Sequence, residues 1–103
     1  MQERGRVIRV VDLYTIICRY QEGTYVQQVH ATELAGAVRC WADQILPSTD
    51  FVPLPPSEVL LVREQLISEA PTAIQDCVNA WAATAFPPSG PLWLDIIKTV
   101  AIS

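Results

Sequence analysis

The first regular pattern in the chain is a pair of strand-like runs on either side of a glycine. Residues 14–20 and 25–29 are rich in β-branched and aromatic side chains, which favour β-strands. Gly23 lies between them and tolerates a positive φ. The pattern predicts a β-hairpin, with a two-residue turn at Glu22-Gly23 or a four-residue loop over residues 21–24. Both give one register, with Tyr20 facing Tyr25, Cys18 facing Gln27 and Ile16 facing Val29.

The start of the first strand is less defined by the pattern. An earlier start near Val7 is an alternative to a start near residue 14. The charges of Arg9 and Asp12 oppose it, because they interrupt the apolar run.

After residue 31 the apolar positions recur at helical spacing. Leu34, Val38, Trp41 and Ile45 form one stripe, which predicts an amphipathic helix. Thr32 is the expected N-cap of this helix. Pro47 marks its end and opens a proline-rich connector over residues 47–56.

A second helix is predicted in the segment SEVLLVREQLISEA. Ser57 would cap it, and Pro71 would terminate it. Val59, Val62 and Leu66 would share its buried face.

Two further strand-like runs complete the chain, CVNAWAATAF and LWLDIIKTVAI. They are joined by PPSG, a typical turn segment. The element order is therefore ββααββ. We predict a single α+β domain over residues 1–103, built in two layers, with a four-stranded, mainly antiparallel sheet and two helices on one face.

Composition narrows the classes of function. The chain has 103 residues, a net charge of −4 and seven basic residues, of which only Lys98 is a lysine, so binding to nucleic acid is not expected. Arg4, Arg6 and Arg9 form a small N-terminal cluster that we interpret as solvated. No signal peptide or membrane-spanning segment is expected. Three widely spaced cysteines suit reduced thiols and a cytoplasmic location.

Cys18 and His30 are candidates for a thiol–imidazole pair. Side chains alternate between the faces of a strand, and the predicted register puts the two on opposite faces, which argues against catalysis. No metal site is expected, since the cysteines lack the close spacing of zinc ligands. No cofactor-binding motif is present either. Asp95 is flanked by Leu94 and Ile96, so it must find a partner or face water.

The segment YTIICRYQEGTYVQQVHATELAGAV resembles the hairpin-then-helix opening of HicB-type antitoxins. It covers residues 14–38. The Pro-Gly-Cys segment expected between strand and helix is absent, as is a DNA-binding tail, and the resemblance assigns no functional residue.

We expect a non-enzymatic protein-interaction module that self-associates as a homodimer or binds a protein partner. Two helices can cover only one face of the sheet, and the other face would be partly apolar. The candidate interface on that face consists of Leu13, Ile17, Val26, Trp93, Asp95 and Ile97. In a competing account, the connector over residues 47–56 folds over this face. The alternative functions are an immunity or antitoxin protein that neutralises a basic toxin, and a small ligand-binding or enzymatic domain that uses the sheet near Asp95.

Overall fold

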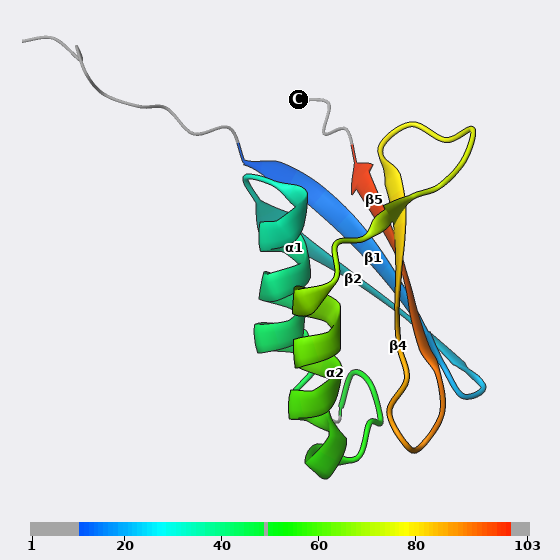
Figure 1. Ribbon diagram of the computed structural model, residues 1–103. Helices are drawn as coiled ribbons and strands as arrows, with labels where there is room; N and C mark the ends of the chain where they lie inside the picture. The colour runs from blue at the N-terminus through cyan, green and yellow to red at the C-terminus, as the bar shows by residue number, and fades with distance from the viewer. Residues whose placement is uncertain (1–10, 49, 100–103) are drawn as a thin grey trace, which may run out of the picture.

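The computed structural model describes residues 11–48 and 50–99 (Figure 1). The expected strand start near Val7 and the last residues of the predicted final strand, 100–102, lie outside these residues. The elements, in chain order, are β1 (Asp12–Tyr20), β2 (Gly23–Ala31), α1 (Leu34–Cys40), the π-helical turn η1 (Trp41–Ile45), α2 (Pro56–Ser68), β3 (Thr72–Ala73), β4 (Ala80–Ala85) and β5 (Leu92–Thr99).

The strands form one antiparallel sheet in the order β2-β1-β5-β4-β3. The first hairpin and the β4–β5 hairpin meet where β1 pairs with β5. Both helices pack against the same face of the sheet (Figure 1). The predicted α+β fold with two helices beside an antiparallel sheet is therefore confirmed.

The predicted four strands and ββααββ order are wrong in detail, because a fifth strand lies between α2 and β4. In this strand, Thr72 pairs with Ala82 and Ala73 pairs with Trp81. Two residues are too few to produce an alternating pattern in the sequence. Their pairing follows from the chain's return along the edge of β4 after α2 ends.

The predicted register of the first hairpin is also wrong, by two residues. The turn consists of Gln21 and Glu22, and Gly23 is the first residue of β2, paired with Tyr20. Gln21 takes the positive φ, at 55°. Gly23 is crowded instead: the outer end of the Tyr25 ring lies where a Cβ of residue 23 would project, so a side chain there would displace that ring. A shift of two residues leaves every side chain on its predicted face.

Both helices begin at other residues than predicted. Glu33, not Thr32, is the N-cap residue of α1, and its side chain makes no capping hydrogen bond. α2 begins at Pro56, one residue before the expected Ser57 cap, because proline at the first helical position already has a suitable φ and needs no N–H acceptor. α1 continues into η1, where the Leu46 N–H donates to the Trp41 carbonyl at 3.0 Å.

The core lies between the helices and the sheet. Its strand members alternate along β1 and β5, and its helical members come from the predicted stripes. Val52 and Leu54 of the connector are fully buried in the same cluster. The connector therefore packs on the helix side of the sheet (Figure 1), which contradicts the account in which it covers the opposite face. No described helix is long and apolar enough to cross a lipid bilayer.

Candidate functional site

The face of the sheet that points away from the helices carries all six residues of the predicted interface. Ile17 of β1 pairs with Val26 of β2 on one side and with Asp95 of β5 on the other. We call this surface the open face. Its strand residues are Leu13, Thr15, Ile17, Arg19, Thr24, Val26, Gln28, His30, Ala80, Ala82, Thr84, Trp93, Asp95, Ile97 and Thr99.

Three large apolar side chains of the open face are exposed. The exposed fractions are 56% for Val26, 49% for Trp93 and 37% for Ile97. Leu13 and Ile17 are half-buried between their neighbours. The apolar surface thus extends across β2, β1 and β5 without any covering element among the described residues.

Asp95 has a partner on this face. Its Oδ2 lies 2.7 Å from Nη2 of Arg19, which projects from the neighbouring strand β1. The sequence alone does not indicate this ion pair, because it depends on the adjacency of β1 and β5. Asp95 lines none of the three hollows described for this protein, so its carboxylate is an ion-pair member on an open surface.

Polar side chains of the open face are joined in a row across three strands. Gln28 Nε2 donates to Thr15 Oγ1 at 3.0 Å, and Thr15 Oγ1 lies 2.6 Å from Thr99 Oγ1. These groups satisfy one another's hydrogen bonds within the protein. Their removal from water would therefore cost less than removal of unpaired polar groups.

Cys18 and His30 lie on opposite faces, as predicted. Cys18 is fully buried in the core and pairs with Tyr25, whereas His30 is exposed on the open face and pairs with Leu13. Burial raises the pKa of the Cys18 thiol to about 12. A thiol that stays protonated at neutral pH is a poor nucleophile, so the geometry and the pKa both argue against thiol catalysis.

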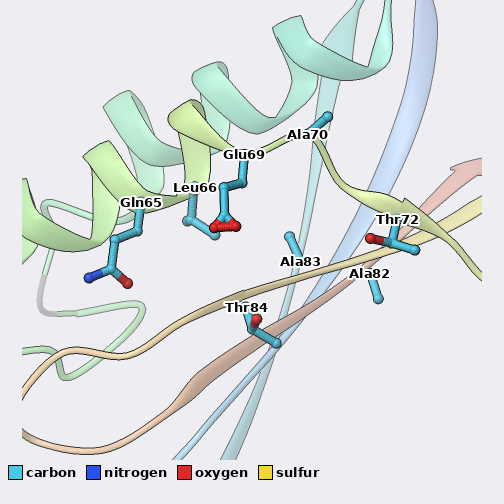
Figure 2. A pocket seen from close by; sticks show the side chains of 8 residues that line it. All are labelled: Gln65, Leu66, Glu69, Ala70, Thr72, Ala82, Ala83 and Thr84. Carbon is cyan, nitrogen blue, oxygen red and sulfur yellow. The ribbon is translucent and has the colours of Figure 1, made fainter.

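A small hollow of about 210 Å³ lies between the end of α2 and the edge of β4 (Figure 2). Gln65 points into this region and accepts a hydrogen bond from the Phe86 N–H at 2.8 Å. Glu69, Thr72 and Thr84 also line it. No hydrogen bond joins the Glu69 carboxylate to the hydroxyl of Thr72 or Thr84 among the described residues.

A second hollow borders the open face at the β4–β5 turn. Arg19 and Trp93 line it together with Ser89. Two side chains hold Ser89 in place. Its Oγ donates to Glu58 Oε1 at 2.6 Å, and the Tyr20 hydroxyl hydrogen-bonds to the same Oγ. This network fixes the turn against α2 and β1, and the sequence pattern gave no signal for it, because its members are far apart in the chain.

No described residues gather as a group of three or more histidine, cysteine, aspartate or glutamate side chains that could hold a metal ion. No protein-family model, curated protein or solved structure matches this chain.

Proposed function

We propose that this protein is a self-associating interaction module and that its contact surface is the open face. The observation that carries the proposal is the exposure of Val26, Trp93 and Ile97 together on one uncovered side of the sheet. Several large apolar side chains exposed together on one side of a sheet are typical of a contact site. A single exposed apolar residue would need no such explanation.

The open face has enough area for a dimer interface. Strands lie about 4.8 Å apart and rise about 3.3 Å per residue, so β2, β1, β5 and β4 present roughly 500 Å² in projection. Two such faces would bury about 1,000 Å² or more, which reaches the lower bound for a specific interface.

The charge on the open face favours a second copy of the same chain. The protein as a whole has a net charge of −4, and like-charged surfaces repel. On the open face, the formal charges of Arg19 and Asp95 cancel within their ion pair. The face is therefore neutral and can meet an identical face without repulsion, and closed two-fold dimers are the commonest assemblies.

Sedimentation equilibrium at micromolar concentration tests this proposal. The wild-type protein is expected at twice its monomer mass of 11.4 kDa. Trp93→Glu should return it to the monomer. About half of the tryptophan side chain is exposed, and its burial contributes roughly 2.5 kcal/mol per copy. Because the substitution is present in both copies, the dimer should lose about 5 kcal/mol of binding free energy, which raises its dissociation constant more than a thousandfold.

Val78→Glu is the matched control, because Val78 is 87% exposed and lies in the segment between β3 and β4, outside the open face. It introduces the same charge and should leave the dimer intact. Far-UV circular dichroism of each variant establishes that the fold is retained. A single 11.4 kDa species for the wild type would contradict self-association. A dimer that survives both Trp93→Glu and Ile97→Glu would place the contact elsewhere, for example at the outer edge of β2.

A further inference from the structure

The two edges of the sheet differ in how they are closed. At one edge, β3 pairs with Trp81 and Ala82 of β4, and the Gln65 side chain accepts the Phe86 N–H at 2.8 Å just beyond that strand. β2 forms the other edge and is nine residues long. Among the described residues, no backbone hydrogen bond from an element other than β1 reaches β2. Its outer side is therefore a long row of unpaired backbone groups.

β2 also lacks the features by which natural edge strands avoid pairing with other chains. Its sequence, GTYVQQVHA, contains no proline and no lysine, arginine, aspartate or glutamate. All nine residues pair with β1 in one unbroken register, so no bulge twists the edge away. Prolines, charged side chains and bulges are the usual protections of an exposed edge. A strand of this length without them is suited to receive a further strand.

The hairpin turn determines which backbone groups of β2 point outward. A turn of two residues leaves Tyr20 and Gly23 as a hydrogen-bonded pair, and hydrogen-bonded pairs then occur at every second position of the hairpin. The N–H and C=O groups that point away from β1 therefore belong to Thr24, Val26, Gln28 and His30.

The same strand from a second copy of the chain fits this edge. If two copies of β2 run antiparallel about a two-fold axis at Gln27, the midpoint of the strand, all nine residues are paired. Val26 of one copy then lies opposite Gln28 of the other, and Thr24 lies opposite His30. Four outward-facing residues in each copy supply one N–H each, so about eight hydrogen bonds would join the strands. The register with the longest overlap is thus one in which donors meet acceptors.

The side chains of β2 are compatible with this pairing. Tyr25 would lie opposite Val29, and an aromatic side chain opposite a β-branched one is a favourable cross-strand pair. The two Gln27 amides would face each other at the axis, where one can donate to the other. The protein has a net charge of −4, but β2 adds no formal charge while His30 is neutral. Two identical edges can therefore meet without repulsion between like charges.

From the free edge, its register and its neutrality, we infer that β2 pairs antiparallel with β2 of a second copy and joins two five-stranded sheets into one. This contact is separate from the open-face contact and does not depend on it. A strip of about 30 Å by 10 Å on each copy buries roughly 600 Å² in total. That area is typical of weak contacts, so the edges pair at higher protein concentration than the open faces do.

Sedimentation equilibrium of the Trp93→Glu variant tests this inference, because the substitution removes the open-face contact. The variant is expected to be a monomer at micromolar concentration and mainly a dimer at millimolar concentration. Hydrogen exchange identifies the surface involved. The outward amides of Val26 and Gln28 should exchange about tenfold more slowly at the higher concentration, where most chains are paired. The amides of Tyr25 and Gln27, which point toward β1, should exchange equally at both concentrations.

Gln27→Glu is the disruptive substitution, because it is nearly isosteric and places two carboxylates opposite each other at the two-fold axis. In the Trp93→Glu background it should raise the dissociation constant of the edge dimer about fivefold or more. Gln44→Glu is the matched control, since it adds the same charge at an exposed position of η1. It should leave the pairing unchanged. Far-UV circular dichroism establishes that both variants retain the fold.

Three results would overturn the inference. The first is a Trp93→Glu variant that stays monomeric at millimolar concentration. The second is a dimer of that variant that Gln27→Glu does not weaken more than Gln44→Glu does. The third is slow exchange of the outward amides at every concentration, since the edge would then already be covered. A wild-type protein that is monomeric at micromolar concentration would contradict the open-face contact alone, and the millimolar measurement would still decide the edge contact.

Discussion

Alkaline pH should destabilise this protein through Cys18. Burial raises the pKa of this thiol in the folded chain to about 12, against an ordinary value of 9.0 that applies in the unfolded chain. Below pH 9 the thiol is protonated in both states and has no effect on the pH dependence. Between pH 9 and 12 the unfolded chain loses the proton and the folded chain keeps it. Unfolding is therefore favoured as the pH rises through this window.

The size of the effect follows from the pKa difference. Each pH unit above the unfolded pKa costs about 1.4 kcal/mol until the folded pKa is reached. From pH 8 to pH 10 the loss is therefore about 1.4 kcal/mol, since nearly all of it arises above pH 9. Burial also raises the pKa of Tyr14 above its ordinary value of 10.0. That contribution has the same sign and lies mainly above pH 10, so pH 10 is the upper limit of the comparison.

Urea unfolding followed by tryptophan fluorescence at pH 8 and pH 10 measures the effect. Cys18→Ala should lower the free energy of unfolding by about 1–2 kcal/mol at pH 8, because it leaves a small cavity. It should also remove about 1.4 kcal/mol of the decrease between the two pH values. Cys77→Ala is the matched control: Cys77 is exposed, so this variant should retain the wild-type pH dependence. Equal pH dependence for the wild type and Cys18→Ala would refute the reasoning.

Two further substitutions test local packing by urea unfolding at neutral pH. Gly23→Ala should destabilise the protein by about 1–3 kcal/mol, because the new Cβ would displace the ring of Tyr25, which packs against the core; a neutral or stabilising effect would show that this ring moves aside without cost. Ser89→Ala should cost a similar 1–3 kcal/mol, because it leaves the buried Tyr20 hydroxyl without its main partner. An unchanged midpoint for Ser89→Ala would show that the network does not hold the β4–β5 turn.

The alternation of apolar residues predicted the faces of the sheet better than it predicted the pairing. Leu92, Leu94 and Ile96 are buried, and Trp93 and Ile97 are exposed, as their spacing on β5 requires. Side-chain direction depends only on position along a strand. The hairpin register depends on the turn, and the crowding of Gly23 by a tyrosine two residues later was not visible in the sequence.

The sequence predicted which residues belong to the candidate site, but not which of them are in contact. Alternation within each strand places Ile17 and Asp95 on one face. The adjacency of β1 and β5 then pairs these two residues and brings Arg19 within reach of Asp95. No local pattern encodes that adjacency, because the contact is between distant parts of the chain. The buried positions of Val52 and Leu54 were missed for a similar reason: prolines indicate a connector, but not where it packs.

The strand order also determines how the chain can fold. β5 is the middle strand of the sheet and the last strand in sequence among those described. The β1–β2 hairpin can form within microseconds, but β1 meets β5 only after nearly the whole described chain has been brought together, as the pairing of Leu13 with Thr99 requires. Until then the apolar side of the hairpin stays in water, where it can aggregate. Loss of the final strand would therefore divide the sheet into two separate halves instead of shortening one edge.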